Sequence, residues 1–326
     1  MRGCWGFSPP EIDLDHLHDE HNLPEADTGK WIFEETEYKE WRESRESKIL
    51  WLYGSPGAGK TMLTKLVAAE FLREPGNTPE GVILGFHFVS PELYNDRVSA
   101  GEAGLPQFWL AKVASDLLYG ILQQDGNLFD GCKAELEKQG DRLFTNPGSL
   151  WKILRKVIQG CRTDNVYILI DSIDGLKEVM CTSSELIGHI LQLKNYCRVK
   201  ILLSSRDVPY ISDQLPKSSH DCAEINLDTN KFGKQDAQAF VKHRVDALEG
   251  WDGDLKKRVT GALLEKGEGT FLVASLAIEY IACLGPGPDI ETFLEKPPSE
   301  LKDIYGNMLS SRNQKNWNQF WAWSVM

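Results

Sequence analysis

The chain has 326 residues, of which 41% are hydrophobic and 26% charged, so it can form a packed core and is not a disordered chain. Its formal net charge is -12 at pH 7. Non-specific binding to nucleic acid or to anionic lipid needs clustered cationic side chains. The composition therefore argues against nucleic acid and membrane surfaces as partners.

The targeting and cysteine patterns favour a cytoplasmic protein. The N-terminus lacks the apolar run of a signal peptide, and the most apolar later stretch, Phe271–Leu284, is too short to span a bilayer. The seven cysteines show no CxxC or CxH spacing, which is typical of reduced thiols in the cytosol. His16, His18 and His21 cluster without cysteines, so we expect no metal site there.

The first predicted elements are a helix, a strand and a second helix. Residues 1–47 are polar and form a helical lead-in, with one helix expected from about Thr28 to Arg45. Ile49–Tyr53 is a short continuous apolar run, typical of a strand buried on both faces. After a glycine-rich turn, apolar side chains recur at helical spacing at Leu63, Leu66, Val67 and Phe71.

The order of strand and helix then recurs. Further strands are expected at Val82–Val89, Val166–Ile170 and Lys200–Leu203. Helical spacing marks three more groups: Leu110, Val113, Leu117 and Ile121; Leu150, Ile153, Leu154, Val157 and Ile158; and Leu186, Ile187, Ile190 and Leu191. Strands alternating with helices of this length predict an α/β fold with a mostly parallel sheet flanked by helices.

The last third of the chain differs from the rest. After about residue 228 only helical spacing appears, and Gly285–Pro288 and Pro297–Pro298 interrupt it, so a small all-helical subdomain is expected. A last helix is predicted around Leu301, Ile304, Tyr305 and Met308. The final residues are crowded with aromatic side chains that need a surface to bury them: Trp317, Phe320, Trp321 and Trp323.

One motif carries the strongest chemical signal. A GxxxxGK[ST] phosphate-binding loop is matched at every fixed position by Gly54, Ser55, Pro56, Gly57, Ala58, Gly59, Lys60 and Thr61. The glycines let backbone N–H groups approach phosphate oxygens, Lys60 reaches the β- and γ-phosphates, and Thr61 offers a hydroxyl to Mg²⁺. Because a buried strand precedes it and an amphipathic helix follows it, we expect a P-loop and not merely a flexible Gly/Pro turn.

Polar residues follow two other predicted strands. Asp171 ends a buried apolar run and is expected to hold Mg²⁺ with Thr61. Asp174 could help to position water, or it could be a plain turn or helix-cap aspartate. Arg206 is the last residue of the polar Ser-Ser-Arg segment at the end of another buried strand. It is either a sensor of the γ-phosphate or part of a surface salt bridge.

These three segments together resemble the NACHT branch of the STAND NTPases, most closely the fungal type with a nephrocystin-like N-terminal region. The resemblance covers about residues 7–323 and includes further segments: Thr28-Gly-Lys-Trp31, Gly269-Thr-Phe-Leu272 with Ala274, and Pro298 through Leu301 to Tyr305 and Met308. It implies a NACHT domain at 48–228, a helical subdomain at 229–310 and, at 311–326, the start of a truncated winged-helix region.

The resemblance implies a molecular switch that binds ATP or ADP with Mg²⁺, in signalling or self/non-self recognition, through self-association or a signalling partner. On this basis the P-loop cradles the phosphates, Asp171 holds Mg²⁺ and Arg206 senses the γ-phosphate. Thr28 and Trp31 are candidates to flank the base, although for Trp31 a place in the core is the favoured interpretation.

One departure bears on catalysis. The family usually has Asp-Glu where this chain has Asp174-Gly175, and Glu178 is out of register. Loss of a group that orients the attacking water typically costs on the order of 10² to 10⁴ in rate. ATP hydrolysis, with Lys60, Asp171, Asp174 and Arg206 as its residues, is therefore expected to be slow or absent. The alternative is a non-catalytic interaction module that nucleotide stabilises.

Overall fold

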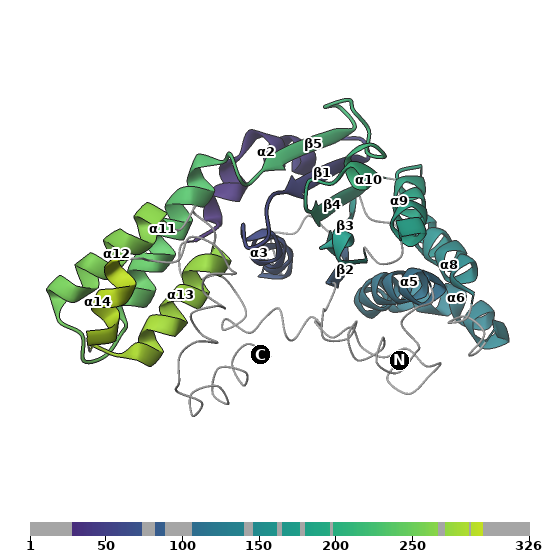
Figure 1. Cartoon of the computed structure of the whole chain (residues 1–326). Coiled ribbons are helices and arrows are strands. Elements are labelled where there is room, and N and C mark those ends of the chain that lie inside the picture. Colours follow the sequence, from purple (N-terminus) through teal and green to yellow (C-terminus); the bar gives the residue numbers. More distant parts are fainter. Residues whose placement is uncertain are drawn as a thin grey trace. The chain divides into compact units, whose positions relative to one another are not determined.

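The computed structural model describes residues 28–73, 82–88, 106–139, 146–161, 165–176, 180–195, 198–266, 271–286 and 288–295 (Figure 1). The chain divides into two compact units: the larger contains residues 29–54 and 60–226, and the smaller contains Thr28, residues 55–59 and the chain from Leu227. The histidine cluster, the last predicted helix, the tryptophan-rich end and the predicted winged-helix start lie outside the described residues.

The larger unit is built on a five-stranded parallel sheet in the order β2-β3-β4-β1-β5 (Figure 1). The strands are β1 (Lys48–Tyr53), β2 (Val82–Phe88), β3 (Asn165–Asp171), β4 (Val199–Ser205) and β5 (Cys222–Asn226). The inner strands β1, β3 and β4 are buried almost along their whole length. Their continuous apolar runs arise because both faces of the sheet are covered.

Helices and short 3₁₀ turns precede β1 or connect the strands. They are η2 (Lys30–Glu34), α2 (Thr36–Glu43), α3 (Lys60–Arg73), α5 (Pro106–Gln124), α6 (Gly126–Gln139), α8 (Pro147–Gly160), η3 (Ile173–Leu176), α9 (Met180–Leu193) and α10 (Pro209–Ser212). The predicted α/β fold with a parallel sheet is thereby confirmed, and the helices expected from residues 63–71, 110–121, 150–158 and 186–191 are present.

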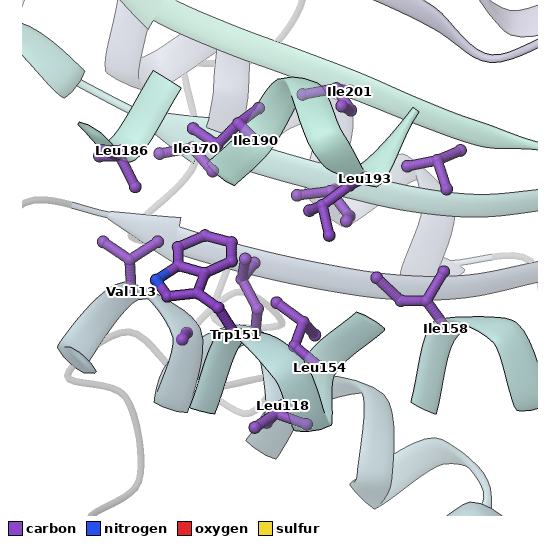
Figure 2. Packing of buried hydrophobic residues seen from close by; sticks show 14 of the residues in the cluster. Val113, Leu118, Trp151, Leu154, Ile158, Ile170, Leu186, Ile190, Leu193 and Ile201 are labelled. Atoms are coloured by element: carbon purple, nitrogen blue, oxygen red, sulfur yellow. The ribbon is translucent and has the colours of Figure 1, made fainter. Parts of the chain in front are cut away.

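One face of the sheet packs against α5, α8 and α9. Figure 2 shows this cluster, in which Ile170 and Ile201 from the strands meet apolar side chains of the helices. Trp151 of α8 is fully buried there, and its indole N–H donates a hydrogen bond to the Leu110 carbonyl at 3.0 Å. The ring therefore contributes apolar area without leaving its polar atom unpaired.

The other face of the sheet is covered by aromatic side chains from α2 and α3. The ring of Tyr167 on β3 lies 4.2 Å from that of Phe71 and 5.5 Å from that of Trp41, between ring centroids. Tyr167 alternates along β3 with Ile168 and Ile170, which belong to the first face. Successive side chains of one strand thus supply two cores.

The prediction of a single helix from Thr28 to Arg45 is wrong. Glu35 is extended, with φ -63° and ψ 137°, and it separates η2 from α2. This break brings Tyr38 and Trp41 into the buried aromatic cluster. The apolar spacing in this segment fits a continuous helix as well as two short ones, so the break left no trace in the pattern.

Helix α6 and strand β5 are among the elements that were not predicted. Helix α6 buries Leu128, Cys132 and Leu136, which lie four residues apart and could have indicated it. Strand β5 is short and lies at the sheet edge, where Glu224 is exposed. An edge strand of this length has no continuous apolar run.

From Leu227 onward, the described part of the smaller unit contains helices joined by turns and no strand, which confirms the predicted helical subdomain. Its helices are α11 (Lys231–Asp246), α12 (Gly253–Lys266), α13 (Phe271–Leu284) and α14 (Pro288–Glu295). Their buried side chains form a separate apolar cluster that includes Val241, Val259 and Ile281. Among the described residues, no helix combines the length and the apolarity needed to cross a bilayer.

A buried lysine lies near the start of β4. Lys200 is fully buried, and its ammonium group donates to the carbonyl oxygens of Ser44 and Glu46, the latter at 2.7 Å. Burial, reinforced by the neighbouring charges of Lys48 and Arg198, lowers the pKa of Lys200 to about 8. A neutral amine still has two N–H donors, so deprotonation keeps both hydrogen bonds.

This lysine gives the stability a defined pH dependence. Between pH 8 and the pKa of a solvated lysine, the unfolded chain binds a proton that the folded chain has lost, so the contribution of Lys200 to the free energy of unfolding rises with pH. We expect the free energy of unfolding of the wild type, relative to that of Lys200→Met, to be higher at pH 9.5 than at pH 7. Urea unfolding followed by circular dichroism measures both values. A difference that is constant with pH contradicts the lowered pKa.

Candidate nucleotide-binding site

The P-loop connects β1 to α3, as predicted. Gly57 and Gly59 have φ of 78° and 93°, in the left-handed region that side chains other than glycine rarely adopt. The ammonium group of Lys60 donates to the Gly54 carbonyl at 2.8 Å, and the Lys60 side chain is buried. Lys60, which begins α3, therefore contacts Gly54 at the start of the loop.

Within the smaller unit, the loop residues 55–59 have partners far along the chain. Asp228 accepts hydrogen bonds from the backbone N–H of Ser55, at 2.9 and 3.0 Å, and from its hydroxyl at 3.0 Å. The backbone N–H of Phe271 donates to the Gly57 carbonyl at 2.9 Å. A Cβ at Gly59 would lie 3.3 Å from the ring of Phe271. Asp228 was not predicted as a site residue, because an aspartate after a short edge strand has no distinctive pattern.

The structure brings Thr61 and Asp171 together within the larger unit. The hydroxyl of Thr61 donates to Asp171 Oδ2 at 2.7 Å, although the two residues are 110 positions apart. The hydroxyl of Ser172 donates to the same oxygen at 3.0 Å, and that of Ser204 donates to Oδ1. Asp171 is 1% exposed. Ser172 and Ser204 were not predicted as site residues.

This arrangement fits a magnesium ion. A buried carboxylate normally has a cationic partner, but in the described part of the chain neither lysine nor arginine forms an ion pair with Asp171, which is held by hydroxyl groups alone. Because Thr61 donates its hydrogen to Asp171, the lone pairs of its oxygen stay available. Hydroxyl and carboxylate oxygens are the ligands that Mg²⁺ prefers. Thr61 and Asp171 are the residues that could hold it.

A lysine one turn further along α3 lies in the electrostatic range of this carboxylate. Burial lowers the pKa of Lys65, and the charge of Asp171 acts in the opposite direction. Its position four residues after Thr61 places it on the same side of the helix. Lys65 was not predicted as a site residue.

Asp174 and Arg206 form an ion pair. The Arg206 Nε–H donates to Asp174 Oδ2, and the backbone N–H of Arg206 donates to Oδ1 at 3.1 Å. The Asp174 side chain is buried and that of Arg206 is 39% exposed. The two residues come from the ends of adjacent strands, since Asp174 lies in η3 after β3 and Arg206 follows β4.

The segment predicted to flank the base lies at the start of the described chain. Gly29 has φ of 80°, and a Cβ there would lie 2.9 Å from Leu66, so this turn packs closely against α3. Trp31 is half-buried, whereas the next residue, Ile32, is fully buried. Trp31 is thus not enclosed in the core.

Comparison with known proteins gives one family match. The family described as Nephrocystin 3, N-terminal, matches residues 27–206. Vegetative incompatibility protein HET-E-1 of Podospora anserina is 24% identical over 314 residues, which cover 90% of this chain and 22% of that protein. The chain thus spans about a fifth of the length of this relative. The two matches confirm the predicted resemblance to a fungal NLR-like NACHT protein with a nephrocystin-like region.

Solved structures give more distant matches. The Orc1 protein of Aeropyrum pernix, in complex with DNA, matches with a TM-score of 0.47 at 17% identity, covering 89% of this chain and 67% of that one. The Orc2 protein of the same organism matches with a TM-score of 0.46 at 13% identity, covering 82% of this chain and 62% of that one.

Proposed function

Because this chain belongs to the family described as Nephrocystin 3, N-terminal, we propose that it is a nucleotide-operated switch of the STAND type that binds ATP or ADP with Mg²⁺. The observation that carries this proposal is the buried Asp171 carboxylate, which has no ion pair in the described structure and accepts a hydrogen bond from Thr61 of the P-loop. Such a pair is what a magnesium-dependent phosphate site requires.

The residues have distinct proposed roles. The loop from Gly54 to Thr61 binds the phosphates, with Lys60 neutralising their charge. Thr61 and Asp171 would hold the magnesium ion, which would supply positive charge to offset that of the nucleotide phosphates. These roles need no movement of Asp171, because its carboxylate already contacts Thr61.

Arg206 is proposed to distinguish ATP from ADP. Asp174 holds its side chain at the end of β4, and a γ-phosphate would compete with Asp174 for the guanidinium group. Only ATP offers this competing anion, so the state of the ion pair reports which nucleotide is bound. Opening of the switch and self-association, in signalling or self/non-self recognition in the cytoplasm, are proposed to follow from this exchange.

An arginine-to-alanine change tests this role. We expect Arg206→Ala to weaken binding of a non-hydrolysable ATP analogue by roughly 10-fold to 100-fold while leaving ADP binding unchanged, since a hydrogen bond to a charged group contributes about 1.5–3 kcal/mol. Isothermal titration calorimetry with excess Mg²⁺ measures both affinities.

Arg198→Ala is the matched control. Arg198 is exposed and directly precedes the same strand, about 26 Å from Arg206 at the rise of an extended chain. It should change neither affinity. Equal weakening of ATP and ADP by Arg206→Ala shows that Arg206 does not sense the γ-phosphate.

A second candidate function is an interaction module that binds nucleotide for stability and does not hydrolyse it. Gly175 favours it, because the exposed position after Asp174 carries no side chain that could orient water. The two functions share the binding site and differ only in turnover, so a phosphate-release assay separates them.

A further inference from the structure

Ser204 is a buried polar residue that directly follows an apolar run in the sheet. It is the penultimate residue of β4, it is fully buried, and it follows Ile201, Leu202 and Leu203. Burying a hydroxyl group in such a position costs free energy unless the group forms hydrogen bonds. Both hydrogen bonds of the Ser204 side chain are to one turn, Asp171–Ser172.

The direction of the Ser204 hydroxyl hydrogen is fixed by the backbone. The N–H of Ser172 donates to Ser204 Oγ at 2.8 Å, so the oxygen acts as an acceptor toward Ser172. A hydroxyl has one hydrogen, and the remaining partner is Asp171 Oδ1. Ser204 therefore donates to the carboxylate.

The turn that makes this possible is strained. Ser172 has φ of 56° and is the only residue other than glycine with positive φ in the described chain. A residue other than glycine is disfavoured in this region, because its Cβ lies too close to the following carbonyl oxygen. Strain of this kind is commonly found at functional sites. In this conformation the Ser172 N–H reaches Ser204 on β4, and the Ser172 hydroxyl lies 3.0 Å from Asp171 Oδ2.

The two carboxylate oxygens of Asp171 are thus held separately. Ser204 binds Oδ1, and Thr61 binds Oδ2 at 2.7 Å. The terminal torsion of an aspartate is otherwise broad. Removing the Ser204 hydroxyl would leave Oδ1 unbound and allow the carboxylate to rotate away from the orientation that faces Thr61.

We propose that Ser204 is a positioning residue of the magnesium site, which orients the Asp171 carboxylate for Mg²⁺ without contacting nucleotide or metal itself. This inference rests on the proposed function, because it assigns a role within the proposed nucleotide site. Residues that orient metal ligands typically change metal affinity by about 10–100-fold when they are removed.

The chain contains a matched control in the next residue. Ser205 is also fully buried, but its hydroxyl accepts from the Trp51 indole N–H at 2.8 Å and donates to the Arg206 carbonyl at 2.9 Å. Ser205→Ala therefore removes a buried, fully bonded hydroxyl of the same strand that has no hydrogen bond to Asp171.

The experiment measures the magnesium dependence of ADP binding by the full chain. In one titration, protein is added to fluorescent ADP in EDTA, which gives the metal-free affinity. In a separate titration without EDTA, MgCl₂ is added at fixed ADP. For Ser204→Ala we expect the MgCl₂ midpoint to rise about 10-fold or more, with metal-free ADP binding unchanged. Ser204→Thr, which restores the hydroxyl, should return the midpoint close to that of the wild type, and Ser205→Ala should not shift it.

Equal midpoints for Ser204→Ala and Ser205→Ala overturn the positioning role while leaving the nucleotide site intact. A wild type that binds no ADP under any condition overturns the proposed function itself. If Ser204→Ala fails to fold, Ser204→Cys takes its place, since a thiol of similar size is a weak donor. A wild-type midpoint in that variant also overturns the inference.

Discussion

Replacing Lys60 by alanine is expected to abolish binding of ATP and ADP. Phosphate groups carry several negative charges, and Lys60, the first residue of α3, is the cation of the P-loop motif. In the wild type, a nucleotide at 100 times its Kd should stabilise the folded chain by about 2.7 kcal/mol. A gain of that size raises Tm by several degrees, so thermal unfolding with and without nucleotide is a sufficient assay.

The control for this prediction is a lysine away from the loop. Lys152 is exposed on α8, and Lys152→Ala should keep the full nucleotide-dependent rise in Tm. Because Lys60 also donates to the Gly54 carbonyl, Lys60→Ala must first show a native circular dichroism spectrum. Equal stabilisation of Lys60→Ala and the wild type by nucleotide would refute a phosphate site at this loop.

Adding a carboxylate at Gly175 is expected to increase ATP hydrolysis. Gly175 is exposed in η3, its φ is outside the left-handed region, and its N–H donates to the Ser172 carbonyl at 2.8 Å. A glutamate therefore fits the backbone and lies next to Asp174. Since a group that orients water contributes on the order of 10² to 10⁴ in rate, Gly175→Glu should release phosphate at least about 10 times faster than the wild type.

Gly175→Gln separates the carboxylate from the added bulk. The amide has the same shape but cannot accept a proton from water as a carboxylate can, so this variant should hydrolyse ATP at the wild-type rate. Phosphate release is measured at saturating ATP and Mg²⁺, so that differences in affinity do not contribute. A wild-type rate that equals or exceeds that of Gly175→Glu contradicts the role assigned to the missing acid.

The elements that could be predicted are those whose environment is uniform along their length. Strands β1, β3 and β4 are buried on both faces, so their sequences are continuously apolar. Helix α8 buries one side and shows the corresponding spacing, and the apolar residues of α3 and α5 recur at the same helical spacing. Strand β5 and the break at Glu35 were missed because each depends on neighbours elsewhere in the fold.

The P-loop and the candidate magnesium residues were determined by the sequence alone, because the chemistry of phosphate binding demands particular residue types at short, fixed spacings. Thr61 and Asp171 could be named from their local contexts without knowledge of their contact. Which other side chains surround them depends on strand order. Placing β4 beside β3 brings Ser204 to Asp171 and Arg206 to Asp174. No local pattern encodes that adjacency, since it arises from the burial of apolar faces across the whole sheet, and only the tertiary structure decided it.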